Sequence, residues 1–103
     1  MKRFQIRVLP KAEEHLATIE AWWRVNRREH PTLVREELRE ALRVLAAFPD
    51  AGVDHRPRRR PRIQKILLKQ SKHYVFYRAL VDDRVVEILA IWSTKQGKEP
   101  PLG

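Results

Sequence analysis

Residues 73–92 read HYVFYRALVDDRVVEILAIW, two apolar runs separated by a short polar segment. Both runs are rich in β-branched and aromatic side chains, which favour strands. The segment VDDR at 81–84 has the composition of a compact turn. The stretch therefore predicts two strands that pair as an antiparallel β-hairpin, and the rest of the fold is built around this hairpin.

The alternation of side chains along a strand assigns the two faces of the hairpin. On the first strand, Tyr74, Phe76, Arg78 and Leu80 are expected opposite His73, Val75, Tyr77 and Ala79. On the second strand, Val85, Leu89 and Ile91 are expected opposite Val86, Ile88, Ala90 and Trp92. Both faces are largely apolar, so we expect one to pack on helices and the other to be partly covered or used for binding.

Two more segments have the pattern of strands. RIQKILL at 62–68 precedes the hairpin and is predicted to join its sheet. FQIRVL at 4–9 alternates apolar and polar side chains and ends at Pro10, as a short first strand does.

Between these strands the apolar period is helical. Pro10 begins a stretch in which four apolar residues keep helical spacing, namely Ala12, Leu16, Ile19 and Trp23. This helix is expected to end at His30-Pro31, because a residue before proline avoids the α region. A second helix is predicted from about Thr32 to about Phe48, and the turn sequence FPDAG closes it. Two amphipathic helices with so short a link should form an antiparallel hairpin.

The fold class that follows is α+β, with a helical hairpin packed on a small antiparallel sheet in the order β-α-α-β-β-β. We expect residues 1–103 to form a single domain, with a basic connection at about 53–62 between the helices and the sheet.

Composition excludes several classes of site. The chain has no cysteine, which excludes disulfides and Cys-ligated metal sites. Its four histidines are scattered, with no carboxylate at metal-ligand spacing, so we expect neither a metal nor a cofactor. No apolar run approaches the roughly 18 residues of a membrane span, and the N-terminus does not resemble a signal peptide. We therefore expect a cytoplasmic protein with no membrane partner.

The positive charge is concentrated in the middle of the chain. The formal net charge is +9, and residues 54–78 carry nine Lys or Arg against one Asp or Glu. The stretch HRPRRRPR at 55–62 holds five of these arginines. Such asymmetry indicates a polyanionic or acidic partner, which is either a nucleic acid or an acidic protein segment.

Several phrases, taken in order, resemble the RelE/ParE superfamily of bacterial type II toxins. They are AEEHLATIEAWW at 12–23, EELREALRVL at 36–45, FPDAG at 48–52, KILL at 65–68, HYVFYR at 73–78 and VVEILAIW at 85–92. The resemblance covers nearly the whole chain. It implies a small toxin that a cognate antitoxin neutralises in a toxin–antitoxin complex. Its two branches imply different targets: ParE-like members act on DNA gyrase, whereas RelE-like members cleave mRNA on the ribosome.

A ribonuclease must activate the 2′-hydroxyl, stabilise charge on the phosphate and protonate the leaving oxygen. By resemblance, Lys65 and Arg78 lie on the strands that supply positive charge, as do Arg62 and Lys69. Nucleolytic relatives often carry His or Tyr after the last strand, where this chain has Ser93. Lys95 and His73 are the remaining candidates for proton transfer. Since an ordinary lysine is protonated at pH 7 and is a poor base, the sequence favours a toxin that is not an enzyme.

The residues predicted to meet the antitoxin or the target are Trp22, Arg58, Arg59, Arg60, Arg62, Lys65 and Arg78. Trp22 lies about 100° around the helix from Trp23, so it is expected to be half exposed. The favoured interpretation is a ParE-like toxin that acts on gyrase. The alternatives are a RelE-like ribosome-dependent endoribonuclease, a non-toxic nucleic-acid-binding domain, and a degenerate toxin that only binds its antitoxin.

Overall fold

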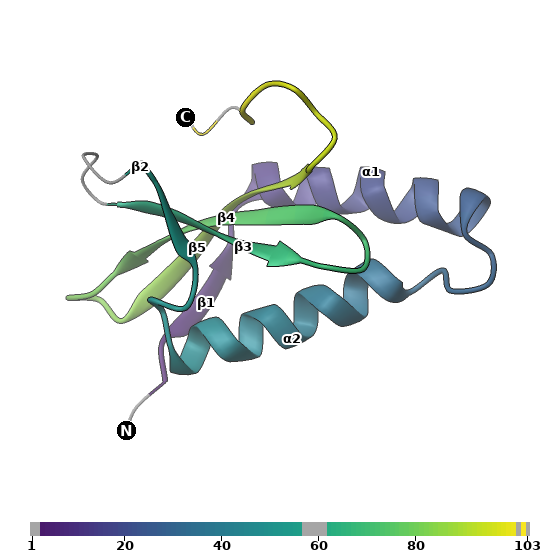
Figure 1. Ribbon diagram of the computed structural model, residues 1–103. Coiled ribbons are helices and arrows are strands. Elements are labelled where there is room, and N and C mark those ends of the chain that lie inside the picture. The colour runs from purple at the N-terminus through teal and green to yellow at the C-terminus, as the bar shows by residue number, and fades with distance from the viewer. Residues whose placement is uncertain (1–2, 57–61, 101, 103) are drawn as a thin grey trace.

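The hairpin predicted at 73–92 lies near the centre of the sheet in the computed structural model, which describes residues 3–56, 62–100 and 102 (Figure 1). Within these residues the elements are β1 (Gln5–Val8), α1 (Pro10–Asn26), α2 (Leu33–Ala47), β2 (Val53–Arg56), β3 (Ile63–Leu68), β4 (His73–Leu80) and β5 (Val85–Ser93). The predicted α+β class and the helical hairpin are confirmed. Arg58, Arg59 and Arg60 lie outside the described residues.

The sheet differs from the prediction in two ways. Its strand order is β1-β5-β4-β3-β2 across the described residues, and β1 pairs with β5 in parallel. The prediction of an antiparallel sheet is therefore wrong for its first strand. Strands β1 and β5 can pair in parallel because both helices and three strands lie between them in the chain. The predicted connection at about 53–62 also contains a strand, because β2 pairs with β3 along Val53–Arg56.

A bulge changes the predicted faces of β5. Phe76 is opposite Ala90, whereas the next residue, Tyr77, is opposite Ile88, so Leu89 is an extra residue on β5. As a result Ile91 joins the core beside the helices, while Leu89 and Ala90 share a cluster on the other face. The predicted grouping of Leu89 with Ile91 is therefore wrong. The predicted faces of β4 are confirmed, with Val75 and Tyr77 on one side and Phe76 on the other.

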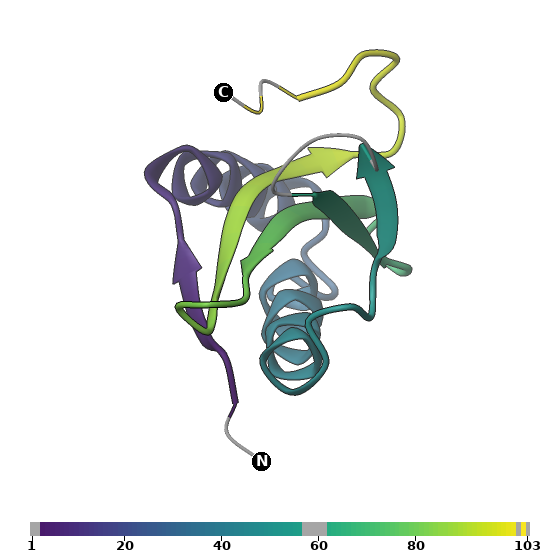
Figure 2. The same cartoon turned by 90° about the vertical axis from the view of Figure 1, so that its left-hand side faces the viewer.

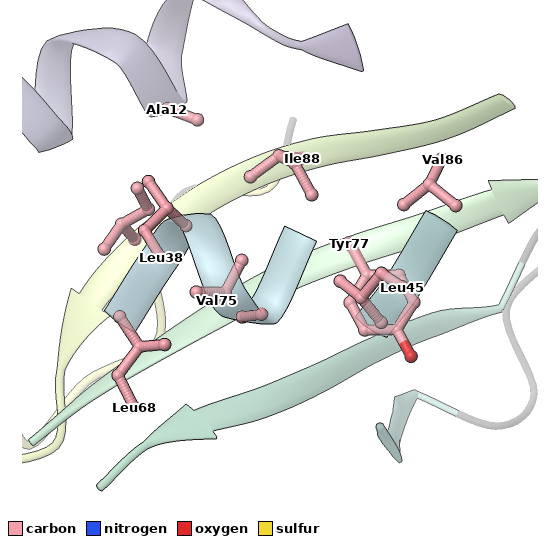
Figure 3. Close-up of a cluster of buried hydrophobic side chains, with 10 residues drawn as sticks. Ala12, Leu38, Leu45, Leu68, Val75, Tyr77, Val86 and Ile88 are labelled. Atoms are coloured by element: carbon pink, nitrogen blue, oxygen red, sulfur yellow. The ribbon is translucent and has the colours of Figure 1, made fainter. Parts of the chain in front are cut away.

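Both helices cover the same face of the sheet. Ala12 of α1 and Leu38 and Leu45 of α2 form one buried cluster with side chains of β4 and β5 (Figure 3). The hydroxyl of Tyr77 extends from this cluster, donating to the Pro49 carbonyl at 2.9 Å and accepting from the Gly52 amide at 2.9 Å. These two bonds fix the turn between α2 and β2.

Helix α1 ends at Asn26, before the predicted stop at His30-Pro31. Its apolar stripe runs out at Trp23, which is buried as predicted and packs with Leu33 and Val34 at the far end of the hairpin. Arg35 makes two hydrogen bonds to Glu20, at 2.6 and 2.9 Å, which link the two helices.

The opposite face of the sheet, here called the open face, carries a second cluster formed by Ile63, Phe76, Leu89 and Ala90. Leu102 packs against this cluster, and Pro100 is buried. Both views place the C-terminal segment on the side of the sheet away from α2 (Figures 1 and 2). The segment after β5 therefore covers part of the open face.

Candidate functional site

The open face holds Lys65 against two aromatic rings. Lys65 on β3 is opposite Phe76 on β4. Its Nζ lies 4.3 Å from the ring centroid of Tyr74 and 6.0 Å from that of Phe76. An ammonium over an aromatic face is attracted by the ring quadrupole. This contact fixes the position of a cation that the sequence had predicted for the site.

Arg78 lies on the same face and is paired with a carboxylate. Its Nε donates to Glu87 at 2.7 Å, and Arg7 on β1 donates to the other carboxylate oxygen at 3.1 Å. The hydrogen bond from Arg78 is the largest of the effects that hold the pKa of Glu87 below its ordinary value. The charge of Arg78 and the hydrogen bond and charge of Arg7 act in the same direction, and burial acts against them. The sequence analysis identified Arg78 but missed Glu87 and Arg7. Arg78 therefore reaches the surface with its charge compensated from two strands.

At the basic end of the sheet, Arg62 is also paired. Its guanidinium lies 3.0 Å from an oxygen of Asp50 and 3.5 Å from one of Asp54. The first contact joins the start of β3 to the turn before β2, and the second joins it to β2 itself. Among the arginines of HRPRRRPR, the structure describes the side chain of Arg62 alone.

The C-terminal segment closes over the aromatic residues of the open face. His55 Nε2 lies 2.6 Å from Glu99 Oε1, and the His55 ring contacts Phe76 edge-on at 4.9 Å. Trp92 Nε1 donates to the Lys98 carbonyl at 3.0 Å. The sequence analysis missed the His55–Glu99 pair, because the two residues are far apart along the chain.

His73 and Lys95 lie elsewhere, beside a pocket that also includes Trp22 and Ser93. His73 shares the helix-covered side of β4 and is opposite Ser93 on β5. Burial lowers the pKa of His73, while the Ser71 backbone and Glu37 oppose this in part. The imidazole is therefore neutral at pH 7. Trp22 is 50% exposed, as the helical geometry predicted.

The structure therefore divides the four residues considered for RNA cleavage into two pairs. Lys65 and Arg78 are on the open face, whereas His73 and Lys95 line the pocket next to α1. Ser93 Oγ accepts a hydrogen bond from the Lys95 amide at 3.2 Å. General acid–base chemistry needs the proton donor within hydrogen-bond reach of the reacting group. The two pairs do not form one constellation.

Two more findings concern what the described residues can bind. Among them, no group of three or more His, Cys, Asp or Glu side chains is arranged to hold a metal ion. No helix within that part of the chain has both the length and the apolar character needed to cross a bilayer.

A protein-family model, described as the ParE toxin of type II toxin–antitoxin system, parDE, matches residues 6–97. The chain belongs to the ParE toxin family. The match spans both helices, strands β2 to β5 and most of β1, so the resemblance seen in the sequence is confirmed on its ParE-like branch. Membership in a toxin–antitoxin family implies a cognate antitoxin as partner. Searches of curated proteins and of solved structures found no match.

Proposed function

We propose that this ParE-family protein stops bacterial growth by acting on DNA gyrase and that its cognate antitoxin neutralises it by direct binding. The family match over residues 6–97 carries the proposal. The arrangement of the charged residues supports gyrase over mRNA as the target. Arg78 is compensated by Glu87, and the candidate proton-transfer residue His73 is buried on the other side of the sheet.

The target is tested by adding the purified chain to gyrase and relaxed plasmid. We expect supercoiling to stop at concentrations of toxin comparable to those that stop growth, and stoichiometric antitoxin to restore it. Primer extension on cellular mRNA after induction is the second readout, and we expect no new codon-aligned 5′ ends. Intact supercoiling together with such ends would instead indicate a ribosome-dependent nuclease.

The basic stretch is proposed as one edge of the surface that meets the antitoxin or the target. Replacing Arg58, Arg59 and Arg60 together with serine should leave folding unchanged and weaken antitoxin binding about tenfold at low salt, since charges at an interface rim act mainly on association rate. The matched control replaces Arg24, Arg28 and Arg39 with serine, which removes the same charge from exposed positions on the two helices and in the turn between them. Equal affinities for both triple variants, measured by surface plasmon resonance at two salt concentrations, would remove the stretch from the interface.

A further inference from the structure

A pocket of about 540 Å³ lies where the second half of α1 faces the β3–β4 turn and the residues after β5. The backbone fixes its two β-side walls relative to each other, because the Thr94 amide donates to the Lys72 carbonyl at 2.9 Å. Lys72 has a positive φ of 63°, which turns the chain sharply between the buried residues Ser71 and His73. The volume of this pocket falls within the range of small-molecule sites.

The charge of the pocket selects an anion. Arg27, Lys72 and Lys95 line it, and none of its described lining residues is acidic. The neighbouring carboxylate of Glu37 does not line it and accepts hydrogen bonds from the amides of Gln70 and Ser71, at 2.8 and 2.9 Å. A second pocket of similar size, about 560 Å³, runs along α2 and is lined by Glu36, Glu37 and Glu40. Because clefts lined by one sign of charge concentrate ligands of the opposite sign, only the first of these two pockets should attract an anion.

Two buried polar atoms at the pocket lack partners. Ser71 is 7% exposed and His73 is 8% exposed, and neither Ser71 Oγ nor His73 Nδ1 has a hydrogen-bond partner among the described residues. A buried polar group without a partner is rare and lowers stability. Both atoms are closed off from solvent in the free chain, so a ligand reaches them only when the two side chains reorient. Hydroxyl and neutral imidazole can each donate or accept, so after such a reorientation they suit a ligand that carries both donors and acceptors.

An aromatic wall completes the pocket. The indole of Trp22 is half exposed, and the Arg27 guanidinium carbon lies 5.5 Å from its ring centroid. Trp22 also contacts Trp23 edge-on, with ring centroids 6.1 Å apart, which holds the indole in place. An exposed, fixed indole beside a cation is a surface on which a nucleobase stacks.

We propose that this pocket binds a nucleoside phosphate, with the phosphate held by Arg27, Lys72 and Lys95 and the base stacked on Trp22. Reorientation of the Ser71 and His73 side chains on binding brings their unpartnered atoms to the remaining polar groups of the nucleotide. A bare phosphate would leave Trp22 and most of the volume unused, and an acidic side chain would leave Trp22 without a ring to stack on. The ligand is either a free nucleotide or the 5′-phosphorylated end of a strand. The inference is independent of the gyrase target, because the pocket is separate from the open face.

Calorimetric titration of the full-length chain with AMP, adenosine and inorganic phosphate tests this site. We expect AMP to bind at least tenfold more tightly than either fragment. The double variant Lys72→Gln/Lys95→Gln should weaken AMP binding about tenfold or more, since it removes charge-assisted bonds to the phosphate. Lys11→Gln is the control, because Lys11 is an exposed lysine of α1 outside the pocket. Trp22→Leu should abolish the preference for AMP over phosphate.

Ser71→Ala separates a binding role from a structural one. It removes a buried hydroxyl that has no partner, so the thermal midpoint of the free chain should stay the same or rise while the affinity for AMP falls. The dinucleotide pApA distinguishes the two sources: affinity equal to AMP indicates a free nucleotide, and affinity at least tenfold higher indicates a strand end. The proposal is overturned if AMP binds no more tightly than phosphate, or if the double variant and Ser71→Ala both bind it as the native chain does.

Discussion

Replacing Gly52 with alanine should lower the free energy of unfolding by about 3 kcal/mol. A Cβ at this position would lie 2.5 Å from the carbonyl oxygen of Lys65 and 2.7 Å from the hydroxyl oxygen of Tyr77. The first neighbour is backbone of the paired strand β3 and the second is fixed by its bond to Pro49, so neither can move cheaply. The methyl group would force β2 away from β3 and break the hydrogen bond from the Gly52 amide to Tyr77.

Gly97→Ala is the matched control. A Cβ there meets nothing within 4 Å, so the change should alter stability by less than about 0.5 kcal/mol. Urea denaturation of the two variants and the native chain measures the difference. If Gly52→Ala unfolds at the same urea concentration as Gly97→Ala, the close approach of β2 to Tyr77 and Lys65 is not a feature of the folded protein.

Much of this architecture could be predicted because the signals are local. The VDDR segment and its two apolar flanks define the β4–β5 hairpin without any long-range information. The helical spacing of Val34, Leu38, Ala41, Leu45 and Phe48 is equally direct, and the first four are buried as it predicts. Phe48 is 65% exposed, because α2 ends before it at Ala47. In both cases the pattern of burial repeats with the period of the element that carries it.

The features that were missed depend on contacts between distant segments. Alternation along β5 cannot reveal that Leu89 is an extra residue, because the bulge exists only relative to β4. The four residues of β2 lie in a polar stretch, and their pairing depends on β3 and on the Tyr77 hydroxyl. The parallel pairing of β1 with β5 likewise joins the two ends of the chain.

The candidate site shows the same division. Sequence analysis identified Lys65 and Arg78 but missed Glu87, the carboxylate that pairs with Arg78. The turn at 81–84 places Leu80 opposite Val85, so counting outward places Arg78 opposite Glu87. An acidic residue in the apolar run VVEILAIW, directly across from an arginine, was the available signal for a buried ion pair. Arg7 could not be found this way, since β1 joins through a long connection.

Glu87→Gln should cost about 2 kcal/mol of stability at pH 7. The Glu87 side chain is only 9% exposed and accepts hydrogen bonds from two arginines, so the variant leaves two cations facing a neutral amide. The loss is smaller than for a wholly buried pair, because Arg7 and Arg78 retain access to water and can be rehydrated. Glu40→Gln is the control: its exposed pair with Arg43, at 2.9 Å, should contribute less than about 0.5 kcal/mol.

The pH dependence identifies the carboxylate itself as the source of this stability. The pKa of Glu87 is lower in the folded chain than its ordinary value of 4.5, so the unfolded chain binds the proton more readily. Its contribution is fully present above pH 4.5 and is lost as the pH falls through the lower pKa of the folded state. The stability gap between the native chain and Glu87→Gln should therefore narrow on acidification below pH 4.5. A gap that persisted undiminished to the lowest pH at which both chains fold would mean that glutamine disturbs packing, and that the two arginines do not stabilise the fold through the Glu87 charge.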